Sequence, residues 1–116
     1  KKRQNLAKVL YENLNDEAKK YIPNIISNYD QNCFWHFPII LSNEKLEKFQ
    51  KFLMKKGYDV VGYGLKLCNN ESTFENYKTN LNSAKLIHEN TLFLPIFDKM
   101  DNDEMEKIAK DINQFF

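Results

Sequence analysis

The sequence lacks the residues on which disulfide-rich and metal-dependent proteins are built. It has only two cysteines, Cys33 and Cys68, among 116 residues, so it carries no disulfide framework of the kind that holds small secreted domains together. It also has only two histidines, His36 and His88, and neither the histidines nor the cysteines have the spacing of a zinc site. We therefore expect reduced thiols, no bound metal and a cytoplasmic location.

An excess of charge and long apolar runs are missing as well. The net charge is +1, with 17 basic and 16 acidic residues interleaved, which argues against a nucleic acid or a membrane as partner. No uncharged apolar run is long enough to cross a membrane, and the chain does not start like a signal peptide. It begins Lys1-Lys2-Arg3 without methionine, which fits a piece of a longer protein and equally the removal of a disordered start or a tag.

What the sequence does contain is a strand, a helix and a second strand in close succession. Residues 33–41 are rich in aromatic and β-branched side chains and predict a largely buried strand. Residues 43–57 predict a helix that ends at Gly57 as a left-handed cap. Its apolar face consists of Leu46, Phe49 and Leu53. Residues 58–63 predict the second strand, so the unit has the length of a βαβ crossover.

Further elements are expected on both sides of this unit. Residues 1–21 predict a surface helix, and residues 69–80 are polar enough to form a mobile surface loop. A short helix capped by Asn82 or Ser83 is expected next, followed by a third strand at residues 91–97.

The last helix has the clearest signals. Asp101 and Glu104 have the spacing of a capping box. One continuous apolar stripe follows, made of Met105, Ile108, Ala109, Ile112, Phe115 and Phe116.

Together these elements predict a single domain over residues 1–116, of α/β (α+β) class. We expect a two-layer sandwich in which helices cover one face of a small mixed sheet of three to four strands. A right-handed crossover would make the first two strands parallel, with the third antiparallel to them.

The order of several pieces along the chain resembles a known family. These pieces are Phe37-Pro-Ile, Lys-Lys-Gly57-Tyr-Asp-Val, Ala84-Lys-Leu-Ile, Thr91-Leu-Phe-Leu-Pro-Ile, Met100 and the helix from Glu104. In this order and spacing they look like the carboxy-terminal small domain of the DegT/DnrJ/EryC1/StrS aminotransferases. The resemblance implies that residues 1–22 are the connecting helix and residues 33–116 the α/β core.

The resemblance also implies a function for the parent protein. Members of the family are fold-type I enzymes that use pyridoxal phosphate, most often to move an amino group onto a keto sugar attached to a nucleotide. Their cofactor lysine lies in a large domain that is absent from this chain. The resemblance thus implies a pyridoxal-phosphate-dependent, homodimeric parent. It also implies a small domain that has no catalytic residue or cofactor of its own and contacts the large domain or a partner subunit.

The exit of the second strand is the candidate site. In the family this part leans toward the active-site cleft, often with a His-Tyr pair, of which this chain keeps only Tyr63. Gly62 and Gly64 would let the backbone approach a ligand, while Tyr63 and Lys66 would offer a hydroxyl and a cation to a phosphate or carboxylate. The alternative is a plain strand exit with glycines at turn positions and an exposed lysine.

Other candidates have ordinary structural interpretations. Trp35, Phe34 and Phe37 could stack on a base, but in a buried strand they are expected to be core. The competing class of function is an independent ferredoxin-like interaction or ligand-binding module. A small domain separated from its large domain should expose an apolar patch around the first helix, whereas an independent module should have a polar exterior or a symmetric dimer face.

Overall fold

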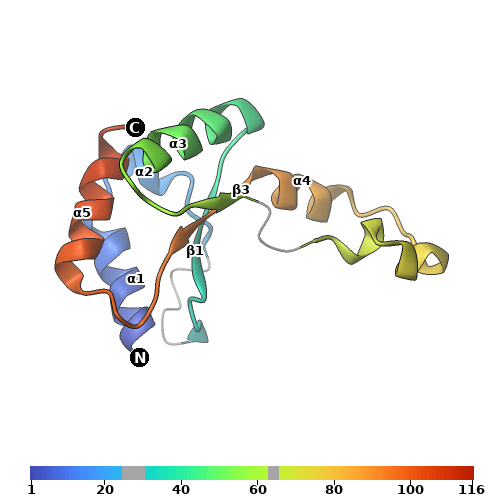
Figure 1. The fold of residues 1–116 in the computed structure, drawn as a ribbon, viewed down its shortest axis with the longest axis horizontal. Coiled ribbons are helices and arrows are strands. Elements are labelled where there is room, and N and C mark those ends of the chain that lie inside the picture. Colours follow the sequence, from blue (N-terminus) through green and yellow to red (C-terminus); the bar gives the residue numbers. More distant parts are fainter. Residues whose placement is uncertain (25–30, 63–65) are drawn as a thin grey trace.

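The computed structural model describes residues 1–24, 31–62 and 66–116. Its helices are α1 (Lys2–Asn13), α2 (Asp16–Lys19), α3 (Asn43–Lys55), α4 (Asn82–Asn90) and α5 (Asn102–Asn113), with two 3-10 helices, η2 (Cys68–Asn70) and η3 (Ser72–Tyr77). Its strands are β1 (His36–Ile40), β2 (Val61–Gly62) and β3 (Thr91–Pro95). Figure 1 shows α1, α3 and α5 gathered on one side of the strands, while α4, η2 and η3 extend away on the other.

The sheet is small, and it is antiparallel rather than mixed. The strand order is β1-β3-β2, and β3 pairs antiparallel with both neighbours. The pairing of β1 with β3 runs over five residues, from His36 opposite Pro95 to Ile40 opposite Thr91, whereas β2 adds only two residues. The mixed character expected for the three- to four-stranded sheet is therefore wrong, because the last strand inserts between the two strands of the crossover. These two run in the same direction without touching.

The helices cover one face of this sheet, as predicted. Alternate strand residues face them and are buried, namely Phe37, Ile39, Leu92 and Leu94. The same core contains the apolar faces of three helices: Leu6, Ala7 and Leu10 of α1, Leu46, Phe49 and Leu53 of α3, and Met105, Ile108, Ala109 and Ile112 of α5. The first helix is thus an integral part of the core.

The two best-patterned helices form where the sequence predicts them. In α5 the Asp101 side chain accepts from the Glu104 amide at 2.9 Å while the Glu104 carboxylate accepts from the Asp101 amide at 2.9 Å, which completes the capping box. At the end of α3, Gly57 has φ 91°, the left-handed conformation that glycine adopts at low cost. Both predictions are confirmed.

The first predicted helix is interrupted, because asparagine side chains form hydrogen bonds with backbone groups where α1 ends. Asn15 caps α2 by accepting a 2.8 Å hydrogen bond from the Ala18 amide. Asn113, at the end of α5, accepts from the Asn15 amide at 2.8 Å and donates to the Asn13 carbonyl at 2.9 Å. These bonds end α1 at Asn13 and turn the chain toward α2.

Two smaller expectations also need correction. The α4 helix begins after Leu81 without a side-chain cap, so neither Asn82 nor Ser83 caps it. Residues 69–80 lie at the surface, as predicted, but much of this segment is folded into the 3-10 helices η2 and η3, and the Asn69 amide bridges it with two bonds to Thr79, at 3.0 and 3.2 Å. Among the described residues, no helix is long and apolar enough to cross a membrane.

Candidate functional site

The exit of β2 is only partly described. Gly62 is the last residue of β2 and lies opposite Leu92. A Cβ added to Gly62 would meet only Cδ1 of Leu92, at 4.0 Å, so packing in the described structure does not require glycine here. Tyr63 and Gly64 lie outside the described residues, and their predicted contacts stay predictions.

Lys66 stands at the far side of this exit, at the start of the segment that leads to η2. Its side chain is 84% exposed, and its ammonium lies 3.6 Å from the Glu71 carboxylate. An ion pair this exposed contributes little to stability. Lys66 thus remains available to a ligand, and equally it fits the alternative of an exposed surface lysine.

The aromatic residues before β1 do not all lie in the core. Phe34 and Phe37 are buried, as predicted, but Trp35 is 73% exposed. The cause is local: Phe34 has φ 45°, a conformation that bulky residues rarely adopt. It turns the Phe34 ring inward and Trp35 outward, where Trp35 stacks on His36 at 6.2 Å and His36 approaches Phe93 at 5.4 Å. The prediction that Trp35 is core is wrong.

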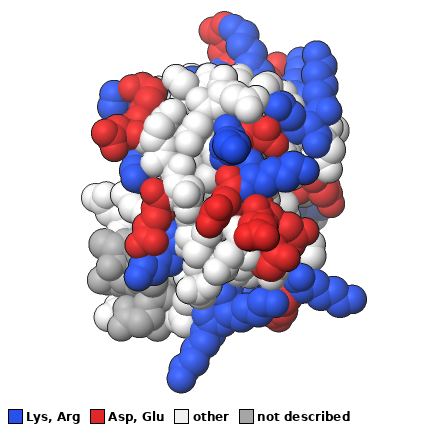
Figure 2. All heavy atoms as spheres, turned by 90° about the vertical axis from the view of Figure 1, so that its left-hand side faces the viewer, with Lys and Arg blue, Asp and Glu red and all other residues white. Residues whose placement is uncertain are grey.

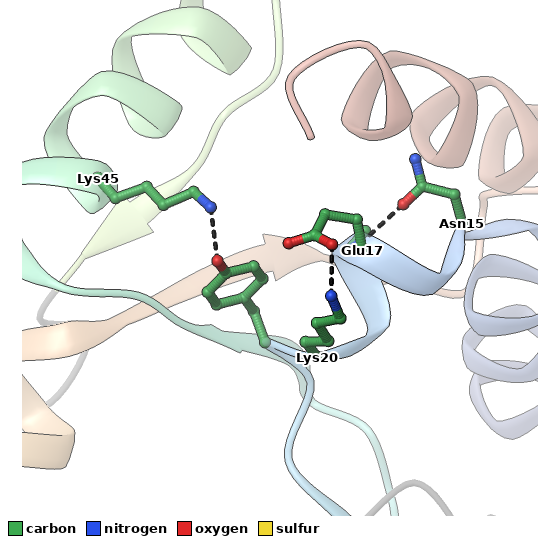
Figure 3. Close-up of polar contacts among 6 residues, drawn as sticks. Asn15, Glu17, Lys20 and Lys45 are labelled. Atoms are coloured by element: carbon green, nitrogen blue, oxygen red, sulfur yellow. Dashed lines mark hydrogen bonds and ion pairs between the residues drawn. The ribbon is translucent and has the colours of Figure 1, made fainter.

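Every lysine lies in the described residues, and none is buried. The most enclosed polar contact of a lysine involves Lys45, whose ammonium donates to the Tyr21 hydroxyl at 2.7 Å (Figure 3). The same ammonium lies 4.6 Å from the centre of the Phe116 ring, which stacks on Tyr21 at 4.9 Å. This cluster fastens α3 to the carboxy-terminal end of the chain.

An ion pair lies beside the cluster of Lys45, Tyr21 and Phe116. Figure 3 shows Glu17 and Lys20 of the α2 region, whose charged groups are 2.5 Å apart. The hydrogen bond from Lys20 holds the pKa of Glu17 below its ordinary value, and the pair raises the pKa of Lys20. Both groups are exposed, so they stabilise a local turn rather than form a site.

Another polar cluster joins the end of α3 to α5. The Tyr58 hydroxyl donates to Oδ2 of Asp111 at 2.6 Å, and Lys56 donates to Oδ1 at 3.0 Å. The Tyr58 bond and then the Lys56 contact lower the pKa of Asp111. Burial, and then the bond to Asp111, raise the pKa of Tyr58 above its usual range. Every partner is satisfied, which is typical of a structural network.

The rest of the charged surface is mixed. Figure 2 shows acidic and basic side chains interleaved over the face that contains α1 and α5. At the start of α1 a hollow of about 390 Å³ is lined by three basic residues, Asp98 and four neutral residues. Its Arg3 is paired with Asp98 at 3.1 Å, and Lys2 donates to the Asp98 carbonyl at 2.5 Å. The described part of the chain holds no cluster of three or more histidine, cysteine or carboxylate side chains that could bind a metal.

One comparison with known proteins decides the family. The family model described as "DegT/DnrJ/EryC1/StrS aminotransferase family" matches residues 1–113, nearly the whole chain. The chain belongs to this aminotransferase family. No curated protein matches it.

The most unusual surface of this aminotransferase family member is formed by residues 66–90, and the sequence did not point to it. The short helix expected after Asn82 or Ser83 carries Ala84, Leu86 and Ile87, and the sequence leaves open which way it faces. The structure exposes Leu86 and Ile87. Residues 66–90 together form a projection, which we call the arm. The sequence signal for the arm is the polar stretch at residues 69–80, where only Phe74 and Tyr77 are apolar.

Proposed function

We propose that this chain is the small domain of a pyridoxal-phosphate-dependent aminotransferase whose parent transfers an amino group to a keto sugar or a similar carbonyl substrate. The observation that carries the proposal is the family match over residues 1–113. It is accompanied by a fold in which helices cover one face of a small antiparallel sheet. In this proposal the chain is not catalytic alone, acts in the cytoplasm, and supports an active site built mainly by the large domain.

The residues of this chain do not fit the cofactor itself. A lysine that forms a Schiff base needs a desolvated pocket to lower its pKa. No lysine here is buried, and the two that are partly buried, Lys19 and Lys45, lie over tyrosine rings. The cofactor of the parent is therefore assigned to segments outside this chain.

The contribution of this chain would come from the exit of β2. In the proposal Tyr63 donates a hydrogen bond and Lys66 supplies a cation to a phosphate or carboxylate, while Gly62 and Gly64 allow close approach of the backbone. The exposure of Lys66 supports this role. The large domain of the same protein or a partner subunit of a homodimer would complete the cleft.

The competing function, an independent ferredoxin-like module, is compatible with the same topology. A strand order of β1-β3-β2, with α3 between β1 and β2, is shared with split βαβ folds. Shape therefore does not separate the two functions, and the family match favours the aminotransferase. The apolar patch expected around the first helix is wrong, because Leu6, Ala7 and Leu10 are buried.

A cofactor-trapping experiment tests the proposal. The chain is incubated with pyridoxal phosphate, reduced with borohydride, digested and mapped by mass spectrometry, beside a urea-unfolded sample of the same chain. We expect weak labelling spread over many lysines and equal in the folded and unfolded samples, because each lysine is solvated. Stoichiometric labelling of one lysine in the folded sample alone would contradict it.

The parent protein provides the positive test. With the large domain present, it should convert a nucleotide-linked keto sugar to an amino sugar when an amino acid is supplied as amino donor, measured by mass spectrometry of the product. A parent that binds no pyridoxal phosphate would favour the independent module.

A further inference from the structure

The sheet has a second face, turned away from the core, whose side chains are unusual for a surface. They are His36, Pro38 and Ile40 of β1 and Phe93 and Pro95 of β3, and each of them is exposed or half-buried. The open face of an antiparallel sheet normally carries polar side chains that alternate with the buried ones. Here every one of these side chains except that of His36 is apolar, so this face is suited to contact more than water.

Three aromatic rings form a continuous row at one end of this face, and we call them the platform. The centre of the Trp35 ring lies 6.2 Å from that of His36, with 22° between the ring planes. The His36 ring in turn lies 5.4 Å from Phe93. Both distances are within the range of attractive ring contacts. Because Trp35 is 73% exposed, the side of its indole that is turned away from His36 is open to a further ring.

The backbone is strained at the point where it presents Trp35. Among the described residues other than glycine, Phe34 alone has a positive φ, of 45°. A bulky residue keeps such a conformation only where the surrounding structure enforces it, and strain of this kind is concentrated at active sites and ligand-binding sites. The Phe34 ring is buried in the core, at 4% exposure. The fold therefore holds Trp35 outward, and its exposure is not that of a loosely placed surface residue.

A basic hollow adjoins the platform along the chain. It is the space of about 390 Å³ at the start of α1, and its charged lining residues are Lys1, Lys2, Arg3 and Asp98. Asp98 offsets only one of the three cations. Cys33 lines the same hollow and precedes Trp35 by two residues, so the two Cα atoms are at most ~7.6 Å apart. The net positive charge of the hollow favours an anion next to the platform.

A row of rings beside a cationic hollow selects a ligand in which a planar ring is joined to an anion. Nucleobases stack on exposed aromatic side chains, and any base does so because every base has a π-face. Small sheets that bind single-stranded RNA use aromatic side chains on their open face in this way. The phosphate of a nucleotide suits the lysine and arginine side chains of the hollow. A neutral sugar or the aromatic side chain of a peptide would contact the platform but leave the hollow unused.

We propose that the platform and the hollow together are a nucleotide-binding site, in which the base stacks on the indole of Trp35 and the phosphate lies in the hollow beside Lys2 and Arg3. The site does not include the residues at the exit of β2. It does not depend on the aminotransferase function, because the argument uses only the surface of this chain. A free nucleotide and the nucleotide part of a larger substrate share this chemistry, and the experiments below separate the two.

Intrinsic fluorescence tests the base contact directly, because Trp35 is the only tryptophan of the chain. Adenosine 5′-monophosphate (AMP) is titrated into the folded chain, and free tryptophan at matched absorbance corrects for the light that the base absorbs. We expect saturable quenching with a dissociation constant on the order of 1 mM, since one stacked base and exposed charge contacts give weak binding. Adenosine, which lacks the phosphate, should bind more weakly, and ribose 5-phosphate, which lacks the base, should not quench.

Saturation-transfer NMR of the base protons measures binding by variants that lack the fluorophore. Trp35→Ala should raise the dissociation constant for AMP at least about fivefold, the lower end of the effect of removing one stacking ring. Trp35→Phe should keep most of the affinity. Lys2→Ala should raise the constant for AMP by up to about fivefold and leave that for adenosine unchanged. The control is Tyr77→Ala, which removes a ring of similar exposure, 78%, from η3 and should change neither constant.

The parent protein identifies the source of the nucleotide. Oxidative footprinting, mapped by mass spectrometry, should modify Trp35 in the parent without nucleotide and should modify it less when AMP is added. If Trp35→Ala raises KM for a nucleotide-linked keto sugar, the base belongs to the substrate. If KM is unchanged while AMP still protects Trp35 in the unchanged parent, a free nucleotide occupies the site. Both results support the site.

Four results would overturn the proposal, once circular dichroism has verified that each variant is folded. Quenching that does not saturate with AMP is the first, and binding that Trp35→Ala leaves unchanged is the second. Ribose 5-phosphate that binds as tightly as AMP is the third, because the hollow would then take an anion without the platform. A Trp35 that is already protected in the parent without nucleotide is the fourth, and it would assign the platform to an interface with the large domain.

Discussion

The phenol of Tyr58 donates a 2.6 Å hydrogen bond to the carboxylate of Asp111, 53 residues later in the chain. This bond joins the turn after α3 to the last turns of α5. Tyr58→Phe should lower the free energy of unfolding by about 1 to 2 kcal/mol, because a hydrogen bond to a charged group is lost from a half-buried site. Urea denaturation measures the change.

Tyr77→Phe is the matched control for this substitution. It removes the same hydroxyl from a ring that is 78% exposed, so the urea midpoint should not move. If both variants unfold at the midpoint of the unchanged chain, the Tyr58 bond does not hold α5 in place.

The pH dependence of stability should report on Asp111. Its pKa in the folded chain is lowered from 3.8, first by the Tyr58 bond and then by Lys56. A lowered folded pKa means that the unfolded chain binds the proton more readily, so the stabilisation is present above pH 3.8 and is lost as the pH falls through the folded pKa. Asp111→Asn should therefore be less stable than the unchanged chain at pH 6, and the two should converge in acid.

Unfolding curves recorded between neutral pH and strong acid measure this convergence. Asp59→Asn, at an exposed position, removes the same formal charge and serves as the control. A difference between Asp111→Asn and the unchanged chain that is the same at every pH would mean that ionisation of Asp111 does not contribute.

The predictions from the sequence that succeeded rest on signals contained in one element. The capping box of α5 needs only Asp101 and Glu104, and the end of α3 needs only Gly57. Such signals are local, so they survive whatever the rest of the chain does. The same holds for four residues of the predicted stripe, Met105, Ile108, Ala109 and Ile112, whereas Phe115 and Phe116 lie after the end of α5 and are only partly buried.

The predictions that failed depend on where distant segments meet. Whether β2 pairs with β1 or with β3 is decided by tertiary packing, and no residue of β2 specifies it. The exposure of Trp35 follows from the backbone conformation of Phe34, which nothing in its residue type indicates. The spacing of apolar residues in the arm does not predict that they are exposed, because the same pattern fits a helix with a buried face. At the candidate site, Gly62 and Lys66 were found near the strand exit, but their function could not follow from the sequence alone.

The stripe of α5 allows a direct test of the core. Ile112 is completely buried, so Ile112→Ala should lower the free energy of unfolding by about 2 to 5 kcal/mol through lost contacts and a cavity. Lys110→Ala, on the exposed face of the same helix, should change it by less than about 0.5 kcal/mol. Equal denaturation midpoints for the two variants would show that α5 packs through another face.

The substitution Gly62→Ala distinguishes a role of this glycine in folding from a role in the active site. A methyl group at this position would meet only Leu92, at 4.0 Å, and an alanine is easier to order than a glycine. Gly62→Ala should therefore leave the thermal midpoint of the chain unchanged or raise the stability by up to about 1 kcal/mol. Gly57→Ala, where φ is 91° with no neighbour within 4 Å, should instead destabilise the chain by about 1 kcal/mol through backbone strain alone.

In the parent aminotransferase the expected order reverses: Gly62→Ala should reduce turnover because the backbone can no longer approach the substrate, while Gly57→Ala should leave turnover per folded molecule intact. Full turnover by a parent that carries Gly62→Ala would mean that the exit of β2 is an ordinary strand end.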